Sequence, residues 1–209
     1  MLVNIHKNDA AMRLRPETKN LIRNRITEGA AILFRKNGYD AVNIDQVMEA
    51  AGLTRGAFYA HFKNKAELFS EVSRHHHPIL RMLRERDGAT ADDLRNQMRQ
   101  IFSDYLNPNH LDEIFAGCTF ASLTGEISRA QSIVKQGYGA ALEEIQSEMM
   151  RGQPDGADAS LMRSAALLAF GAIPAAMACE DAQERAAVLT AAHTGFETLI
   201  HAALAPIHS

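Results

Sequence analysis

Apolar residues recur every three or four positions along most of this chain, which is the spacing of one buried helix face. The apolar–polar alternation of a half-buried strand does not extend over any useful length. Proline is well placed at the start of a helix, and the pair Asn37-Gly38 is a typical helix end. The pattern therefore predicts an all-α protein whose first helix runs from Pro16 to about Asn37. The buried stripe of that helix is expected to contain Ile22, Ile26, Ala30 and Leu33.

The stretch 43–65 predicts two short helices joined by a tight turn. Its first half carries an apolar stripe and ends at Gly52, which can adopt the left-handed turn without a Cβ clash. Thr54 then caps a second helix, Arg55–Phe62, that buries Phe58 and Phe62. The outer face of that helix is small, polar and cationic. This combination is typical of a DNA-reading helix-turn-helix.

The rest of the chain predicts a larger helical body. Asn64 can cap a helix that begins at Lys65, and Pro78 predicts a break near His77. Further helices are expected at 90–106, 117–129, 131–151, 159–178 and 181–205. The expected domains are therefore a three-helix head, residues 1–66, and a ligand-binding and dimerisation body, residues 67–209. The last two helices are so apolar that each must bury two faces, one of them against a second copy of the chain.

Charge is distributed unevenly between these two parts. The net charge is −3, but residues 1–65 hold eleven Lys/Arg and six Asp/Glu, whereas residues 66–209 hold eleven and nineteen. The balances are +5 and −8. A basic head on an acidic body is the asymmetry expected when only the head meets phosphate.

Composition points to a cytoplasmic protein. The chain has no run of about 18 apolar residues, so we expect no membrane span. The first residues lack the apolar segment of a signal peptide. Two cysteines cannot build a disulfide framework and fit a reducing compartment.

The segment GYDAVNIDQVMEAAGLTRGAFYAHFKNKAELF resembles the DNA-binding domain of the TetR family of transcriptional regulators. The resemblance covers roughly residues 14–69, and a looser one covers AGCTFASLTGEISRA in the body. It implies a homodimer held by a four-helix bundle of the last two helices of each chain. It also implies a near-palindromic operator and regulation by a small molecule.

The head supplies the candidate DNA contacts, which are Asn43, Thr54, Arg55, Gly56, Ala57, Tyr59, His61 and Lys65. Arg55 either reads guanine bidentately or contacts a phosphate, and the hydroxyl of Thr54 either caps its helix or contacts a phosphate. Gly56 and Ala57 let the helix enter the groove closely. The resemblance implies phosphate contacts for Tyr59, His61 and Lys65, although a tyrosine here can instead pack under the helix.

Other cations near the head have two interpretations. Lys19, Arg23 and Arg25 form either a solvated face or flanking phosphate contacts. Arg13 and Arg15 lie on an N-terminal arm that either reaches DNA or is a disordered leader.

The body supplies a candidate effector pocket on the strength of the resemblance. Its expected lining is Phe102, Tyr105, Leu106, Phe115, Cys118, Phe120, Leu123 and Met149. Apolar walls with few polar groups suit a small, mostly apolar ligand. The alternative is that these residues are ordinary core.

No catalytic, cofactor or metal site is expected. Consecutive residues of a regular helix point about 100° apart, so His75, His76 and His77 cannot share one metal ion. Cys118 is interpreted as a buried thiol rather than a redox sensor. The leading hypothesis is a ligand-responsive repressor; the alternatives are a helical enzyme or carrier with a vestigial head, and a sequence-independent DNA-coating protein.

Overall fold

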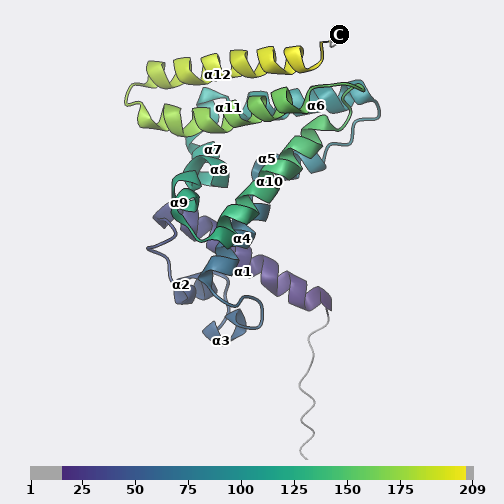
Figure 1. Ribbon diagram of the computed structural model, residues 1–209. Helices are drawn as coiled ribbons and strands as arrows, with labels where there is room; N and C mark the ends of the chain where they lie inside the picture. Colours follow the sequence, from purple (N-terminus) through teal and green to yellow (C-terminus); the bar gives the residue numbers. More distant parts are fainter. Residues whose placement is uncertain (1–15, 206–209) are drawn as a thin grey trace, which may run out of the picture.

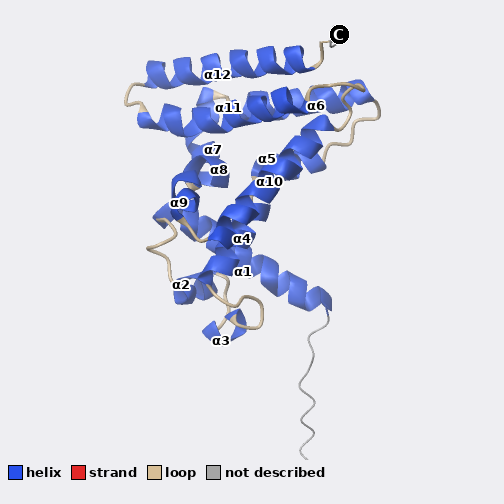
Figure 2. Ribbon diagram, viewed as in Figure 1, coloured by secondary structure: helices blue, strands red, loops and turns tan. Residues whose placement is uncertain are grey.

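The computed structural model describes residues 16–205, and the predicted arm with Arg13 and Arg15 lies outside this range. Within it, the chain forms helices joined by loops and no strands, as predicted (Figure 2). The head contains α1 (Pro16–Asn37), α2 (Ile44–Ala50) and α3 (Arg55–Phe58). The connection to the body is α4 (Lys65–His75) and α5 (Pro78–Arg84). The body contains α6 (Ala91–Tyr105), η1 (Pro108–His110), α7 (Leu111–Gly117), α8 (Thr119–Ser122), α9 (Thr124–Arg129), α10 (Ser132–Met150), α11 (Ala159–Ala178) and α12 (Ala182–Ala203).

Short-range chemistry fixes α2 and the turn that follows it. The Oδ1 atom of Asn43 accepts from the backbone N–H of Gln46 at 2.9 Å, and Gln46 Oε1 accepts from the N–H of Asn43 at 2.8 Å. This reciprocal pair satisfies two free N–H groups at the helix start. Gly52 then takes a φ of +65°, so the predicted glycine corner is confirmed.

The second helix of the motif is shorter than the predicted Arg55–Phe62. Regular α-helix ends at Phe58, and the chain continues in turns in which His61 N–H donates to the Phe58 carbonyl at 2.9 Å. Thr54 is the N-cap residue, as predicted, but its hydroxyl makes no capping hydrogen bond, so of its two interpretations the capping one is not observed. Phe58 and Phe62 are buried as expected.

The head core extends beyond the head helices. It is built around Phe34, Phe58, Phe62 and Phe69, and it also buries Leu123, Ile127 and Val134. The last three come from the ends of α8 and α9 and from α10. Because α10 lies along α4, the body closes the side of the head that faces it (Figure 1).

The predicted break between α4 and α5 is confirmed. Asn64 caps α4 by accepting from the N–H of Glu67 at 2.9 Å, and α5 begins at Pro78. The ends of α6, α10, α11 and α12 lie within two residues of the predictions.

The predicted helix 117–129 is instead two short helices, α8 and α9, and α7 before them occupies a stretch expected to be loop. Cys118 has extended backbone angles (φ −105°, ψ 118°), which interrupt the helix between α7 and α8.

Helices α11 and α12 form a layer at the end of the molecule opposite α3 (Figure 1). Gly195 permits their close approach, since a Cβ there would lie 2.7 Å from Leu168 Cδ2. Helix α11 has the length and apolar composition of a membrane-spanning helix, although no such segment was expected from the sequence. In the structure its inner face is buried in the body, whereas Leu167 remains 46% exposed.

Candidate nucleic-acid interface and effector cavity

The exposed surface of α3 is the candidate DNA-binding face. Asn43, Thr54, Arg55 and Gly56 are exposed and Ala57 is half-buried. No atom of the described residues lies within 4 Å of a Cβ placed at Gly56, so residues 16–205 leave room for close approach of a ligand there. These five predicted DNA contacts are therefore accessible or partly accessible in the structure.

Arg55 forms an ion pair with Asp45, a partner that was not predicted from the sequence. Its Nη1 atom lies 2.5 Å from Asp45 Oδ2, and both side chains are more than half exposed. Asp45 is in the first turn of α2, so this ion pair joins the two helices of the motif. The pair aligns the guanidinium while leaving its other N–H groups free for a base or a phosphate.

Tyr59 follows α3 and is 57% exposed. Its ring meets Phe58 edge-on, with centroids 5.3 Å apart, and no hydrogen bond joins its hydroxyl to any of residues 16–205. The alternative in which this tyrosine packs under the helix is therefore wrong. The hydroxyl is free to donate to an external acceptor.

His61 is buried rather than exposed on the outer face. Its Nδ1 atom has no hydrogen-bond partner among the described residues. Burial lowers its pKa below the ordinary value, and the nearby charges of Lys19 and Arg23 lower it further. The predicted phosphate contact of His61 therefore lacks the exposed side chain that the sequence suggested.

Lys65 also differs from the prediction. Its Nζ atom donates to the carbonyls of Tyr39 at 2.7 Å and Val42 at 2.9 Å, and it lies 4.0 Å from the centre of the Tyr39 ring. Burial lowers its pKa. This ammonium group holds the loop between α1 and α2 in place, so the structure does not present it to a phosphate.

Arg23 fits neither of its two interpretations, whereas Arg25 remains exposed, as both interpretations require, although it makes one internal hydrogen bond. Arg23 forms an ion pair with Glu71 at 3.0 Å, donates to the His61 carbonyl at 2.6 Å and covers the Phe62 ring at 4.1 Å. Arg25 donates to the Ala51 carbonyl at 2.6 Å. Both side chains connect α1 to the helix-turn-helix. Lys19 is exposed, as both interpretations require.

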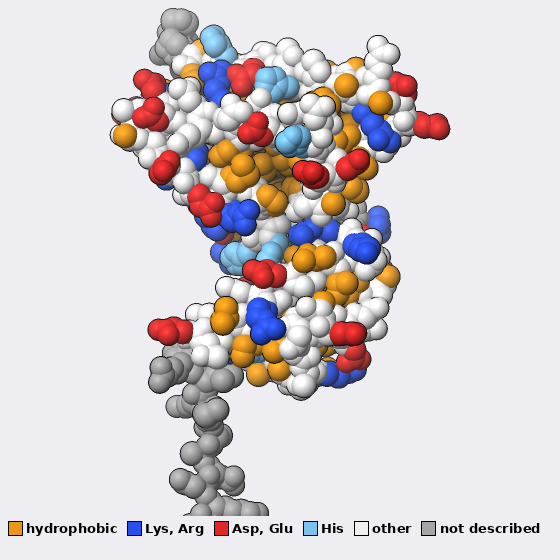
Figure 3. Space-filling view, turned by 180° about the vertical axis from the view of Figure 1, so that it is seen from behind, with side chains coloured by type: hydrophobic (Ala, Val, Ile, Leu, Met, Phe, Trp, Pro, Cys, Tyr) orange, Lys and Arg blue, Asp and Glu red, His pale blue; other side chains and the backbone are white. Residues whose placement is uncertain are grey.

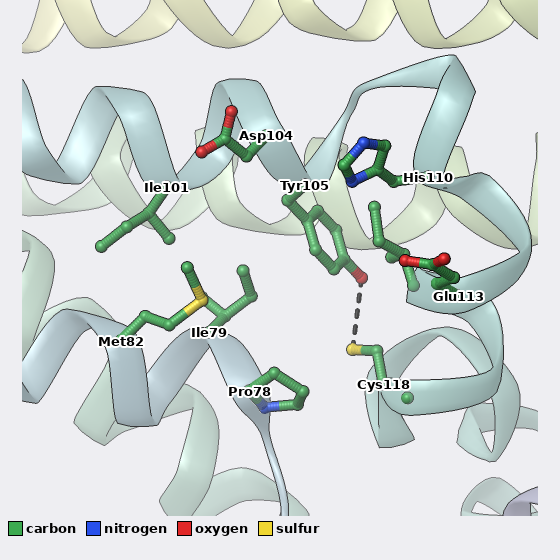
Figure 4. A pocket seen from close by; sticks show the side chains of 11 residues that line it. Pro78, Ile79, Met82, Ile101, Asp104, Tyr105, His110, Glu113 and Cys118 are labelled. Atoms are coloured by element: carbon green, nitrogen blue, oxygen red, sulfur yellow. Dashed lines mark hydrogen bonds between the residues drawn. The ribbon is translucent and has the colours of Figure 1, made fainter.

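The body contains an apolar cavity of about 230 Å³ between α5, α6 and α7 (Figure 4). It is lined by Pro78, Ile79, Met82, Ile101, Asp104, Tyr105, His110, Glu113, Ile114, Gly117 and Cys118. On the face of the molecule shown in Figure 3, apolar side chains line a hollow in the body, and acidic and histidine side chains lie at its edge.

Of the predicted lining, only Tyr105 and Cys118 reach this cavity. Most of the other predicted lining residues are fully buried core: Phe102, Leu106, Phe120, Leu123 and Met149. Phe115 packs on the outside of that core. In the structure the five buried residues fill space inside the bundle and do not line this cavity.

The two predicted residues that line the cavity are in contact with each other. The Tyr105 hydroxyl donates to Cys118 Sγ at 3.3 Å (Figure 4). Burial raises the pKa of both groups. Cys118 is therefore a protonated, buried thiol, and the cavity wall is neutral at this point.

Two polar contacts link the region around this cavity to the head. Arg35 at the end of α1 donates through Nε to the Ala116 carbonyl of α7 at 2.8 Å. The backbone N–H of Tyr39 donates to Glu126 Oε2 of α9 at 2.5 Å. Helix α7 lines the cavity and also touches α1. The sequence offered no signal for either partnership.

The three histidines of the run differ in exposure. Residues 16–205 contain no group of three His, Cys, Asp or Glu side chains arranged to hold an ion. His77 is buried and stacks on Phe120, with ring centroids 4.0 Å apart, whereas His75 is exposed.

Residues 26–72 match the family profile described as "Bacterial regulatory proteins, tetR family". The chain is 51% identical over 45 residues to the Transposon Tn10 TetC protein of Escherichia coli, covering 22% of this chain and 23% of that protein. It is 38% identical over 52 residues to the HTH-type transcriptional repressor AcnR of Corynebacterium efficiens, covering 25% and 28%. These matches span about a quarter of the relatives' length.

The whole fold is similar to that of the solved SmeT–triclosan complex. The TM-score is 0.57 at 22% identity, with 87% of this chain and 91% of that one covered. At this identity the likeness concerns the fold, including the helical body.

Proposed function

Because this chain belongs to the TetR family of bacterial regulatory proteins, we propose that it is a dimeric, sequence-specific transcriptional repressor released from DNA by a small molecule. The observation that carries the proposal is the exposed face of α3, where Arg55 and Tyr59 project from a small, unobstructed helix surface. The same segment lies within the part of the chain that matches the family.

The proposed dimer joins the layer of α11 and α12 to the same layer of a second copy. This layer exposes Leu167 and Leu168 on α11, which are 46% and 37% exposed. Small residues such as Gly171 and Ala191 are also exposed on these helices and permit close helix packing. A two-fold dimer would place two α3 helices in successive major grooves, with half-sites about 10 bp apart or a multiple of it. The operator is therefore expected to be nearly palindromic.

The proposed effector occupies the cavity between α5, α6 and α7. Its apolar wall and volume of about 230 Å³ suit a small, mostly apolar molecule. The similar fold of SmeT was solved as a complex with triclosan, which supports regulation by a small molecule. Such a ligand would act by pushing α7, and with it the Arg35–Ala116 and Tyr39–Glu126 contacts, towards a head position that does not fit the operator.

An enzyme or carrier with a vestigial head is not favoured. The matched relatives are transcriptional regulators, and α3 retains an open reading surface. The proposal places the protein in the cytoplasm, with access to operator DNA.

Selection of bound fragments from genomic DNA tests the proposal. The full chain is expected to enrich one near-palindromic sequence, and affinity should fall steeply with salt because several phosphates are contacted. Tyr59→Phe should enrich the same sequence more weakly, since a phosphate contact carries no sequence information. Uniform recovery of fragments would instead support sequence-independent coating.

A further inference from the structure

A second, cationic cleft lies where the head meets the body. It has a volume of about 440 Å³ and is lined by Glu28, Ala31, Ile32, Arg35, His75, His76, His77, Pro78, Arg81 and Gly117. Its walls are therefore the C-terminal half of α1, the break between α4 and α5, and the end of α7. Blue and pale-blue side chains gather at this narrow part of the molecule in Figure 3. The volume is in the range of sites that hold small molecules.

The two guanidinium groups of this cleft lack carboxylate partners. Arg74 and Arg84, which lie close to it in sequence, both pair with Glu144. For Arg35 and Arg81, in contrast, no carboxylate oxygen lies within 4.0 Å in the described part of the chain. Arg35 uses Nε for the Ala116 carbonyl, which leaves its Nη1 and Nη2 groups available. The side chain of Arg81 donates no hydrogen bond to residues 16–205.

His77 is one of the residues that line the cleft, and its ring contains a buried nitrogen without a hydrogen-bond partner among the described residues. His77 is 1% exposed, and its Nε2 is hydrogen-bonded to the Ser73 carbonyl. A carbonyl only accepts, so Nε2 carries the hydrogen atom. Burial lowers the pKa of His77 to about 3, so the ring is neutral and Nδ1 has a free lone pair. Nδ1 is buried and has no partner among the described residues. A buried acceptor of this kind is costly unless something donates to it.

We propose that this cleft binds a small hydroxylated oxyanion. Its carboxylate or phosphate would be held by Arg35 and Arg81, and its hydroxyl would donate to Nδ1 of His77. Guanidinium groups suit both kinds of oxyanion because their paired N–H groups match two oxygen atoms. Glu28 is the one acidic residue in the wall, so the cleft keeps an excess of positive charge.

This site is distinct from the apolar cavity but mechanically connected to it. Both are bordered by Pro78 and Gly117, which separate a neutral apolar space from a cationic one. An anion bridging Arg35 of α1 and Arg81 of α5 would join the head directly to the body. It would therefore favour one head position, and the affinities for anion and operator would be linked reciprocally.

Titration calorimetry on the full-length protein without DNA tests the site. The probes are glycolate, acetate, inorganic phosphate and the neutral analogue glycolamide, all in one chloride buffer. We expect glycolate to bind at least tenfold more tightly than glycolamide, because the amide lacks the charge. We expect about a fivefold advantage over acetate from the hydroxyl. Equal binding of glycolate and acetate would overturn the role of His77. Comparison of phosphate with glycolate distinguishes the two kinds of oxyanion.

Variants locate the binding. Arg81→Gln removes a side chain that makes no internal hydrogen bond, so the protein should fold normally, and glycolate affinity should fall at least tenfold. Arg35→Gln should show a similar loss. Lys135→Gln removes one positive charge from an exposed position on α10 outside the cleft and should bind as the wild type does. If both arginine variants bind like Lys135→Gln, or if the wild type binds none of the anions, the proposal is wrong. Because DNA is absent, this outcome is separate from the test of operator binding.

Discussion

The backbone N–H of Tyr39 donates to Glu126 Oε2 at 2.5 Å, although 87 positions separate the two residues in the chain. The contact depends on Gly38, which has a φ of +82° and whose missing Cβ would lie 2.9 Å from Glu126 Oε1. The loop between α1 and α2 is thus shaped to receive a carboxylate from the body. Through this contact the body binds the backbone of the head, in addition to the apolar packing of Leu123, Ile127 and Val134.

Glu126→Ala should reduce the free energy of unfolding by about 1–3 kcal/mol, because a charged hydrogen bond to backbone is lost. Urea denaturation measures this change. Glu143→Ala removes an exposed carboxylate from α10 and should change stability by less than about 0.5 kcal/mol. Equal effects of the two substitutions would show that the Tyr39–Glu126 contact does not stabilise the protein.

Lys65→Met tests whether this residue supports the head or contacts DNA. Methionine keeps the side-chain length but loses both hydrogen bonds to the Tyr39 and Val42 carbonyls, so we expect a loss of about 1–3 kcal/mol of stability. The slope of log affinity against log salt should not change. A slope reduced by about one would instead reveal a phosphate contact. Lys63→Met, at an exposed position nearby, should leave stability unchanged.

Arg55→Lys separates base reading from phosphate binding. Lysine keeps the charge but cannot bind guanine bidentately in the same way. If Arg55 reads a base, the substitution should reduce the preference for operator over random DNA by about 1–3 kcal/mol while random-sequence binding stays nearly constant. Fluorescence anisotropy with both DNA types measures the difference. Equal weakening on both DNAs would assign Arg55 to a phosphate.

Leu167→Asp tests the proposed dimer layer. A carboxylate placed in an apolar helix interface should weaken dimerisation by at least about 2 kcal/mol, roughly 30-fold. Sedimentation velocity at micromolar concentration measures the shift towards monomer. Ile133→Asp alters a residue of similar exposure, 43%, on α10 and should leave the dimer intact. A dimer unaffected by Leu167→Asp would place the interface elsewhere.

Stability should fall in acid because of the buried histidines. Burial lowers the pKa of His76 from 6.5 to about 4 in the folded protein, with smaller contributions from Arg35 and His75. The unfolded chain therefore binds more protons between these values, and stability is complete above pH 6.5 and declines towards pH 4. The slope is at most about 1.4 kcal/mol per pH unit for each such histidine.

His76→Gln should make this decline shallower, whereas the same change at exposed His75 should alter it less. Urea denaturation at a series of pH values gives both slopes. A decline that is unchanged in His76→Gln would mean that His76 is not protonated on unfolding.

Much of the helical layout follows from local signals in the sequence. Helix starts at Asn43 and Asn64 and the turn at Gly52 rest on capping and backbone preferences that act within four residues. The interruption at Cys118 has no such signal. It has extended backbone angles between two short helices, and the adjacent Gly117 does not take the positive φ that marks the turn at Gly52.

The sequence predicted the exposed residues of the candidate site. It did not predict the residues whose position depends on contacts with distant parts of the chain. The openness of Arg55 and Tyr59 follows from their positions opposite Phe58 and Phe62. The inward placement of Lys65 and the carboxylate from Glu126 depend on tertiary contacts across 26 and 87 positions, which helical spacing cannot reveal. The prediction of the cavity lining was mostly wrong because periodicity identifies apolar residues but does not distinguish those that fill the core from those that line a cavity.

The head core is completed by Leu123, Ile127 and Val134 of the body, and this has a practical consequence for exchanging parts between relatives. A chimera that joins the first 66 residues to a foreign body would leave these apolar surfaces without their complement. A workable graft must therefore carry matching residues from α8, α9 and α10 along with the reading head. The DNA-binding head of this fold can therefore be exchanged only together with the body residues that complete its core.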